Sequence, residues 1–321
     1  MDVLSDVLAT VRLSSAVHIC PELSAPWGIW FPAQTDRAVF YLLSRGSCYL
    51  EVEGRPVTLV GGDLAMIPHG AEHSLRDRPE TPTIPIEQLI REGCPSTTRA
   101  LQHGGGGEKS ALVSGYFKFE NRAAGRLLAA LPQVIHITSE LAQSVPWLEG
   151  TLRFLSSEAN SSQPGAEIAM ARLSDVLFIQ ILRAFIAQEE REGRTCDKHA
   201  GMLRALVDPD ISKALAFMHQ QPHHPWTVAE LAREVGMSRT GFAVRFKEKA
   251  GVSPLDYLTQ WRMQKAWDLL RQGEENVEEI ALRVGYESGA AFSKAFKREM
   301  GFPPGSYRRA LGSAAAEASR N

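Results

Sequence analysis

The chain has 321 residues, of which 44% are hydrophobic and 22% charged, and its 35 Lys and Arg against 37 Asp and Glu give a formal net charge of -2. This composition excludes a disordered, collagen-like or membrane-embedded chain, and the length predicts two domains of roughly 150 residues each. The near-neutral total argues against a uniformly basic nucleic-acid-binding protein, because a phosphate track requires a surplus of Lys and Arg.

The cysteines and the N-terminus indicate a reducing cytoplasm. The four cysteines lie far apart without a CxxC pair, which predicts neither a structural zinc site nor a disulfide framework. They are Cys20, Cys48, Cys94 and Cys196. The N-terminus carries Asp2 and Asp6 where a signal peptide carries positive charge. The most apolar later stretch, 176–187, contains Arg183 and is too short to span a bilayer, so we expect a cytoplasmic protein without a membrane segment.

Residues 16–119 are predicted to form β-structure. Short apolar runs are separated by Gly or Pro at roughly 8 to 12 residue spacing, which is typical of a sandwich or small barrel. These runs are 39–43, 49–52, 57–60 and 64–67. Glu53 and Gly54 between two runs predict a hairpin turn. Residues 80–108, rich in Pro, Thr and Gly, are expected to form a surface loop.

A motif in this region resembles the cupin barrels. Residues 62–73 fit the spacing G-x5-P-x-G-x2-H, which ends at His73. With SAPWG, LLSRGSCYL and GGGGE, the motif resembles the cupin-type regulatory domain that is fused to AraC-type DNA-binding domains, over about residues 5–140. Small barrels often close around one ligand, so His18, Trp27 and His73 are the predicted effector pocket. A purely structural His73, bonded to backbone inside the barrel, is the alternative.

The metal ligands of enzymatic cupins are missing. Those cupins carry an H-x-H…E motif upstream, where this chain has Ala33, Thr35 and Val39. A lone His73 cannot hold a catalytic ion, which requires at least three protein ligands. The sequence therefore predicts no metal, no cofactor and no catalytic residue.

Two helices are predicted after the barrel, at 146–156 and 167–190, with a polar break at 157–165. The second helix carries an apolar stripe at helical spacing, which must be buried. The stripe consists of Leu173, Val176, Leu177, Gln180, Ile181, Ala184 and Phe185. Its partner is either the barrel of the same chain or the same helix of a second subunit, because such a helix offers a two-fold symmetric patch.

The C-terminal third contains an internal duplication. Residues 228–257 align with residues 277–307, with one residue added in the turn of the second copy. Twelve aligned positions are identical, where chance gives about two in thirty. In the first copy these are Val228, Glu230, Ala232, Val235, Gly236, Ser238, Phe242, Phe246, Lys247, Gly251, Pro254 and Tyr257.

Each copy has the sequence pattern of a helix-turn-helix. A short helix ends at a glycine suited to the left-handed conformation, Gly236 or Gly285. Ser238 or Ser288 then stands where an N-cap begins a second helix. Two Phe residues at i and i+4 fix one face of that helix to the core, which leaves the opposite face for the DNA major groove. The predicted DNA-binding residues are Arg239, Thr240, Ala243, Val244, Lys247, Ala290, Ser293, Lys294, Lys297 and Arg298.

A long helix is predicted between the two copies, from Pro254 through Gln272. At 1.5 Å per residue its length is roughly 30 Å, close to the ~34 Å of one DNA turn, so two successive major grooves are within reach. Residues 210–310 hold 15 Lys and Arg against 12 Asp and Glu, a balance of +3 that leaves -5 for the remainder. The near-neutral total therefore conceals a mildly basic C-terminal region.

The segment from about 211 to 309 resembles the AraC/XylS family of transcriptional regulators. The resemblance rests on GMSRTGFAVRFK, AGVSP, RMQKAWDLL, EIALRVGYES and FSKAFKREMGFPPGSYRR. It implies a seven-helix DNA-binding domain, sequence-specific promoter binding and activation by contact with RNA polymerase. The chain departs from the family at Val244, where Arg is frequent, which shifts the predicted base reading to Arg239, Thr240 and the second recognition helix.

The sequence predicts an α+β multidomain protein with an N-terminal cupin-like β-barrel carrying a helical hairpin and a C-terminal all-α double helix-turn-helix domain. The expected parts are a sensor domain at 1–140, a connector with dimerisation helices at 141–209, a DNA-binding domain at 210–310 with helix-turn-helix units at about 228–250 and 277–300, and a disordered tail at 311–321.

The predicted function is a dimeric, effector-responsive transcriptional activator and not an enzyme. Its expected partners are double-stranded promoter DNA, RNA polymerase, an unknown small-molecule effector and a second copy of the chain. Two alternatives are a metal-dependent cupin enzyme with a DNA-binding appendage and a non-specific architectural DNA protein.

Overall fold

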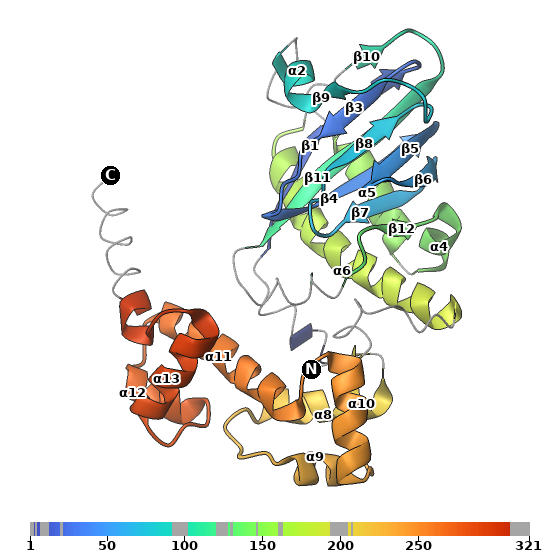
Figure 1. Cartoon of the computed structure of the whole chain (residues 1–321). Coiled ribbons are helices and arrows are strands. Elements are labelled where there is room, and N and C mark those ends of the chain that lie inside the picture. Colours follow the sequence, from blue (N-terminus) through green and yellow to red (C-terminus); the bar gives the residue numbers. More distant parts are fainter. Residues whose placement is uncertain are drawn as a thin grey trace, which may run out of the picture. The chain divides into compact units, whose positions relative to one another are not determined.

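The computed structural model of the chain contains two compact units (Figure 1). One comprises Arg12–His199, and the other combines Met1–Val11 with Ala200–Asn321. The structure describes residues 3, 5–6, 13–19, 22–91, 102–119, 128, 131–145, 147–159, 163–192, 205–206 and 208–308. The predicted tail at 311–321 and most of the connector after residue 192 lie outside these residues.

The described residues of the first unit form two β-sheets. The larger has the order β10-β2-β11-β4-β7-β12, with β1 also paired to β11, and the smaller has the order β6-β5-β8-β3-β9. The strands are β1 (Leu13–Ile19), β2 (Glu22–Ser24), β3 (Gly28–Phe31), β4 (Arg37–Arg45), β5 (Ser47–Val52), β6 (Arg55–Val60), β7 (Leu64–Ile67), β8 (His73–Arg76), β9 (Ile84–Pro85), β10 (Gln102–Gly104), β11 (Lys109–Phe119) and β12 (Ile135–Ile137). This β-rich unit confirms the predicted fold class of the N-terminal region.

The predicted hairpin joins β5 and β6. Glu53 has φ 49° and Gly54 has φ 76°, and two residues with positive φ make a turn whose twist matches that of the flanking strands. Val52 pairs with Arg55 directly across the turn. The four predicted apolar runs lie in β4, β5, β6 and β7.

The strand β4 is buried on both of its faces. On one face, Tyr41 and Leu43 belong to a core of side chains that comes from both sheets. On the other face, the Phe40 ring stacks on Phe117 of β11 with ring centroids 5.0 Å apart. The centroids of Phe117 and of Phe178 in the helix α6 are 5.1 Å apart. The unit therefore has an inner core between its sheets and an outer core under α6.

The expected loop at 80–108 contains regular structure, so that expectation was wrong in part. It includes β9, the helix α2 (Ile86–Arg91) and β10. β9 pairs with β3 and β10 with β2, pairings that link residues far apart in the sequence. Leu89 of α2 is buried, and this apolar contact helps to hold the Pro- and Gly-rich segment against the sheet.

Among the described residues of this unit, three helices follow β12, namely α4 (Ser139–Ser144), α5 (Leu148–Ala159) and α6 (Ala166–Glu192). Five residues of the predicted stripe on α6 are buried, whereas Leu173 is half-buried and Val176 is 46% exposed. α6 packs on β1, β11 and β12 of its own chain. Among the described residues, no helix is long and apolar enough to span a membrane.

The second unit is helical. Its described helices are α8 (Pro209–Gln220), α9 (Val228–Glu234), α10 (Arg239–Ala250), α11 (Pro254–Gln272), α12 (Val277–Arg283) and α13 (Gly289–Met300), and residues 205–206 and 304–308 are also helical. α11 contacts α10 of the first helix pair and both α12 and α13 of the second. This arrangement confirms the predicted all-α double helix-turn-helix domain.

Candidate nucleic-acid interface

The first helix-turn-helix consists of α9 and α10, and a side chain caps each helix. Thr227 accepts a hydrogen bond from the amide of Glu230, and Ser238 accepts one from the amide of Gly241, each at 3.1 Å. In the turn, Gly236 has φ 71°, a left-handed conformation that favours glycine. These local bonds fix where α10 begins.

The second helix-turn-helix, α12 and α13, is capped in the same manner. Asn276 accepts a bond from the amide of Glu279 at 2.9 Å, and the Glu279 carboxylate accepts one from the amide of Asn276 at 2.8 Å, which completes a capping box. Ser288 accepts a bond from the amide of Ala291. In both copies of the duplicated sequence, a side-chain oxygen therefore caps the start of each helix.

The structure places the predicted DNA-binding residues on the outer faces of α10 and α13. Eight are exposed, namely Arg239, Thr240, Val244, Lys247, Ala290, Lys294, Lys297 and Arg298. Ala243 and Ser293, predicted at the flanks, are half-buried. The paired aromatic residues on the opposite faces are fully buried, and they are Phe242, Phe246, Phe292 and Phe296. Each helix thus presents one polar face to solvent.

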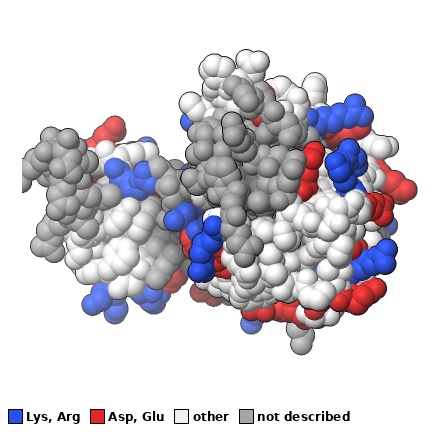
Figure 2. All heavy atoms as spheres, turned by 90° about the horizontal axis from the view of Figure 1, so that it is seen from above, with Lys and Arg blue, Asp and Glu red and all other residues white. Residues whose placement is uncertain are grey.

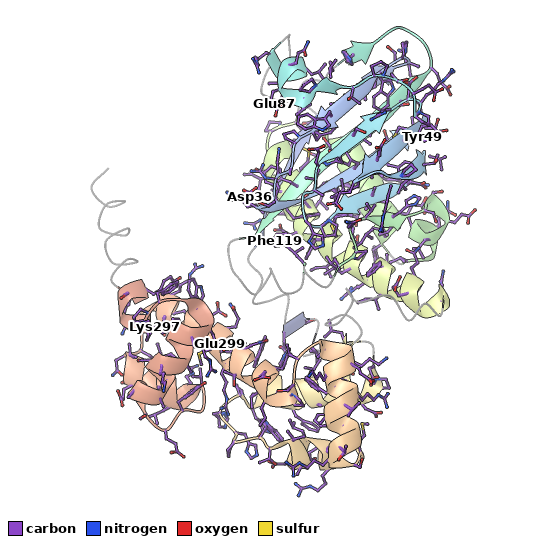
Figure 3. The ribbon with its side chains drawn as sticks, viewed as in Figure 1. Asp36, Tyr49, Glu87, Phe119, Lys297 and Glu299 are labelled. Atoms are coloured by element: carbon purple, nitrogen blue, oxygen red, sulfur yellow. The ribbon has the colours of Figure 1, made fainter. Side chains whose placement is uncertain are left out.

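The two outer faces carry different chemistry. Val244 of α10 is 53% exposed, and the aligned residue of α13 is Lys294. Lys297 lies one turn further along α13, where it is exposed (Figure 3). Arg298 donates to the Glu299 carboxylate at 3.2 Å, so part of its charge is already paired. The free positive charge of α13 therefore comes mainly from its two lysines.

The helix α11 connects the two helix-turn-helix motifs. Ser253 caps it by accepting a bond from the amide of Asp256, Pro254 occupies its first turn, and Gly273 ends it in a left-handed conformation. Its 19 residues give a length of about 28 Å. This length is close to one turn of B-DNA, as the sequence predicted.

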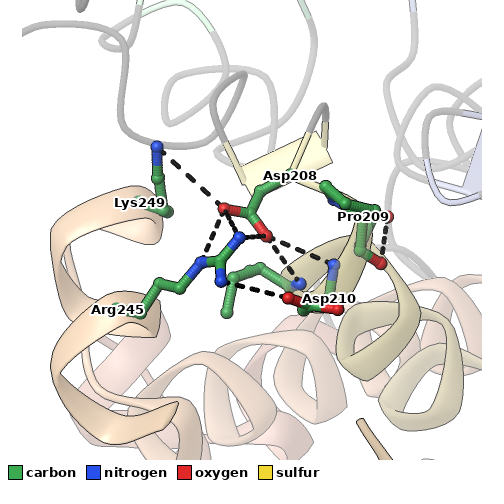
Figure 4. A network of polar contacts seen from close by, with 7 residues as sticks. Asp208, Pro209, Asp210, Arg245 and Lys249 are labelled. Atoms are coloured by element: carbon green, nitrogen blue, oxygen red, sulfur yellow. Dashed lines mark hydrogen bonds and ion pairs between the residues drawn. The ribbon is translucent and has the colours of Figure 1, made fainter. Parts of the chain in front are cut away.

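The sequence did not reveal that Arg245 of α10 is part of an ion-pair network (Figure 4). Its Nε and Nη2 donate to the two carboxylate oxygens of Asp208 at 2.9 and 3.0 Å, and its Nη1 lies 3.0 Å from Asp210. Asp208 also caps α8, and its side chain is 5% exposed. The duplication contains one clue, because the residue aligned with Arg245 is the buried Ala295. Arg245 therefore ties α10 to α8 rather than facing outward.

Basic side chains do not form a continuous track on the visible surface. Figure 2 shows Lys and Arg interspersed with Asp and Glu on the face that it displays. In the sequence, residues 210–310 carry only three more Lys and Arg than Asp and Glu. An interface with DNA would therefore depend on individual exposed cations rather than on a general basic coat.

In the barrel, His73 uses both ring nitrogens. Nδ1 lies 2.7 Å from the Ala71 carbonyl oxygen and must donate to it, so Nε2 accepts a bond from the Tyr41 hydroxyl at 2.6 Å. The ring stacks on Phe31 with centroids 4.9 Å apart. Burial lowers the pKa of His73 to about 4, although the bond to Ala71 and the nearby charge of Glu72 raise it. His73 is thus held as a neutral imidazole.

Trp27, the second predicted pocket residue, is buried, and its indole Nε1 has no hydrogen-bond partner among the described residues. The side chain of His18 lies outside the described residues. Burial raises the pKa of the Cys48 thiol to about 12, so this thiol is unreactive. Within the described part of the chain, no three His, Cys, Asp or Glu side chains are grouped so that they could hold a metal ion.

Two protein-family models match the chain. One, described as a cupin, matches residues 2–187, and the other, described as a helix-turn-helix domain, matches residues 231–310. The first match alone covers more than half of the chain. Both agree with the two kinds of fold that the structure contains.

Relatives match over nearly the whole chain. An AraC-like transcription regulator of Streptomyces lividans is 33% identical, over 96% of this chain and 98% of the relative. The HTH-type transcriptional regulator AlkR of Acinetobacter baylyi is 31% identical, over 96% of this chain and 99% of the relative. Among solved structures, the DNA-binding domain of the global transcriptional factor AdpA in complex with a target DNA is 33% identical, over 33% of this chain and 96% of that domain, with a TM-score of 0.32.

Proposed function

Because this chain belongs to the AraC family of transcriptional regulators, with a cupin domain and a helix-turn-helix DNA-binding domain, we propose that it reads promoter DNA by inserting α10 and α13 into two successive major grooves. The chain is a DNA-binding regulator rather than an enzyme, in agreement with the names of its relatives, which are transcription regulators. Neither the metal-dependent enzyme nor the architectural protein considered above is favoured.

One observation carries the proposal, namely the pair of exposed polar faces on α10 and α13. Both helices are capped, packed through buried Phe pairs, and joined by a helix about as long as one DNA turn. Arg239 and Thr240 at the start of α10 and the two lysines of α13 are the proposed contacts to bases and phosphates. Val244 suits the methyl group of a thymine, because it is apolar and exposed.

Footprinting and salt dependence test this proposal. Protection is expected on one DNA face across two adjacent major grooves of a promoter fragment. Lys294→Ala and Lys297→Ala should each flatten the plot of log affinity against log salt by about one unit, whereas Val244→Ala, which removes no charge, should leave its slope unchanged. Binding without sequence preference among promoter fragments would contradict the proposal.

A small-molecule effector in the barrel is the proposed signal. The buried indole N–H of Trp27 lacks a partner, and buried polar groups normally have one, so this donor is available to a ligand. His73 would contact a ligand through its stacked ring, since both of its nitrogens are engaged. His18 completes the proposed set. Trp27→Phe should weaken effector binding about tenfold, the equivalent of one hydrogen bond, in calorimetric titration of a ligand identified by thermal-shift screening.

A second copy of the chain is the proposed partner of the sensor unit. Apolar side chains are exposed on α5 and α6 and just before them, which is unusual for a surface that stays in water. They are Trp147 (83%), Phe154 (52%), Ile168 (70%) and Val176 (46%). In sedimentation velocity, Ile168→Glu should shift a dimer to a monomer. Val60→Glu changes an equally apolar exposed residue on β6 and should leave the dimer intact.

RNA polymerase is the remaining proposed partner, and the cytoplasm, where the promoter DNA lies, is the proposed location. The proposed sensor, connector and DNA-binding regions are 1–140, 141–209 and 210–310. Transcription in vitro with purified polymerase and the footprinted promoter should increase when the regulator and its effector are added. A decrease would identify a repressor instead.

A further inference from the structure

The loop that precedes the first helix-turn-helix lies against the turn of the second. In the turn between α12 and α13, Gly285 has φ 86°, and a Cβ atom added to it would lie 2.8 Å from the carbonyl oxygen of His223 and 2.9 Å from its Cα. His223 belongs to the loop between α8 and α9. Gly236, the aligned glycine of the first unit, has φ 71° but nothing within 4 Å of such an atom. The close approach is therefore specific to the second turn.

Arg262, in the middle of α11, lies at the same junction. Its Nε donates to the Pro222 carbonyl at 2.6 Å and its Nη2 to the His224 carbonyl at 2.8 Å, so it grips the loop on both sides of His223. Its guanidinium lies 5.9 Å from the ring centre of Tyr286, which belongs to the turn between α12 and α13. Nη2 is also 2.8 Å from the position that a Cβ of Gly285 would take.

The chemistry of this contact requires arginine. Arg153, Arg245 and Arg283 pair with carboxylates, but Arg262 is held by two backbone carbonyls and has no carboxylate within 4 Å among the described residues. A planar guanidinium can donate two bonds in fixed directions while its face lies toward an aromatic ring. A lysine ammonium has no such fork. The contact is thus directional rather than a general neutralisation of charge.

We infer that Arg262 is a positioning residue that locks the loop before α9 against the turn before α13 and so fixes the spacing and rotation of the two recognition helices. This inference rests on the proposed two-groove reading of DNA. The operator would contain two short DNA sequences, here called boxes, one for each recognition helix. If the two helices are held rigidly, binding of the second helix is effectively intramolecular when the boxes have one particular spacing, and affinity is lower at other spacings. In this proposal α11 sets the distance between the two helix-turn-helix motifs, and Arg262 sets how one motif is rotated relative to the other about the axis of α11.

The test compares Arg262→Ala and Arg262→Lys with the natural full-length chain by fluorescence anisotropy. The probes are the footprinted operator, the same operator with one or two base pairs inserted between its boxes, and an operator with one box scrambled. For Arg262→Ala, affinity for the intact operator should fall at least tenfold while affinity for the single box changes less than twofold. The preference for natural spacing should shrink, and Arg262→Lys should not restore it.

A glycine pair supplies an independent readout if Arg262→Ala fails to fold. Gly285→Ala and Gly236→Ala impose a similar backbone strain, but only the first pushes the two loops apart. Gly285→Ala should lose the spacing preference, and Gly236→Ala should keep it. Equal losses for the two variants, or equal weakening by Arg262→Ala on every probe, would overturn the inference. If the natural chain binds no DNA with sequence preference, the proposed function fails first.

Discussion

At the scale of single residues, Arg245 shows how one side chain can be removed from a binding face by its partners. Three carboxylate oxygens lie within 3.0 Å of its guanidinium, two from Asp208 and one from Asp210. The Asp208 carboxylate also accepts bonds from the first amides of α8. Because this carboxylate is nearly inaccessible to water, loss of its cation leaves a buried charge only partly compensated.

We predict that Arg245→Ala destabilises the helical unit by about 2 kcal/mol. Asp208→Asn keeps a capping side chain but removes the charge, so Arg245→Ala should cost less in that background. Hydrogen exchange of the full chain measures both effects, and faster exchange should be largest in α8 and α10 and absent from the barrel. Equal costs in the two backgrounds would show that the ion pair contributes nothing.

The neutral state of His73 gives the barrel a defined dependence on pH. Its pKa is about 4 in the folded chain against 6.5 for a free histidine, so the unfolded chain binds the proton first as the pH falls. The stability from the neutral ring is complete above pH 6.5 and is lost as the pH falls toward 4. The loss is about 1.4 kcal/mol per pH unit within this window.

We therefore predict that His73→Gln flattens the pH dependence of the barrel between pH 6.5 and 4. Glutamine can still accept the bond from the Tyr41 hydroxyl, so the comparison isolates the titration from the loss of a partner. The measurement is urea unfolding of both proteins across this range, followed by exchange in β4 and β8. A stability difference that does not vary with pH would contradict a buried neutral His73.

At the scale of elements, the cap of α10 has two roles that one substitution can separate. Ser238 accepts a bond from the amide of Gly241, and the start of α10 is part of the proposed DNA contact. A helix N-terminus attracts phosphate and also tolerates an aspartate cap. A carboxylate at position 238 would thus satisfy the helix but repel DNA.

We predict that Ser238→Ala lowers the stability of the helical unit by about 1 kcal/mol, whereas Ser238→Asp leaves it nearly unchanged. For binding to the footprinted operator the order should reverse, with Ser238→Asp the weaker binder at low salt. Thermal unfolding and anisotropy on the same samples provide the two readouts. If Ser238→Asp binds DNA as well as the natural chain does, the start of α10 does not face phosphate.

Elements that depend on local signals were predictable, and those that depend on distant partners were not. The hairpin at Glu53 and Gly54 and the capped helices of the duplication follow from turn and cap residues next to them in the sequence. Arg245 and Arg262 bond groups that are 37 to 40 residues away, and no local pattern identifies such a partner. For the same reason β9 and β10 were missed, since their pairing strands lie elsewhere in the chain.

At the scale of the whole molecule, the charge is distributed unevenly. Residues 210–310 have a balance of +3 and the rest of the chain -5. So small a surplus gives weak non-specific attraction to DNA, because that attraction scales with the number of phosphates neutralised. Useful affinity would then come from joining contacts, first the two helices held by α11 and then two copies of the chain.

The N-terminal residues are connected to the helical unit rather than to the barrel. Met1–Val11 groups with the helical unit rather than with the barrel that follows it. Val3 and Asp6 are both buried, and the Asp6 carboxylate lies 3.5 Å from Nδ1 of His219 in α8. Burial lowers the pKa of His219 to about 3, and its ring stacks on Trp261 with ring centroids 3.6 Å apart. Along the sequence, the barrel segment therefore lies between the two segments that make up the helical unit.

We predict that deletion of residues 1–11 destabilises the helical unit by about 2 kcal/mol, because it removes the burial of Val3 and the acidic neighbour of His219. Hydrogen exchange should become faster in α8 and α11 and stay unchanged in β4 and β11. Asp6→Asn keeps the packing and should give a smaller change in the same helices. The cupin family match begins at residue 2 and implies the opposite, since a segment belonging to the barrel would loosen its strands instead. Faster exchange in β4 and β11 after the deletion would therefore assign the N-terminus to the sensor and not to the helical unit.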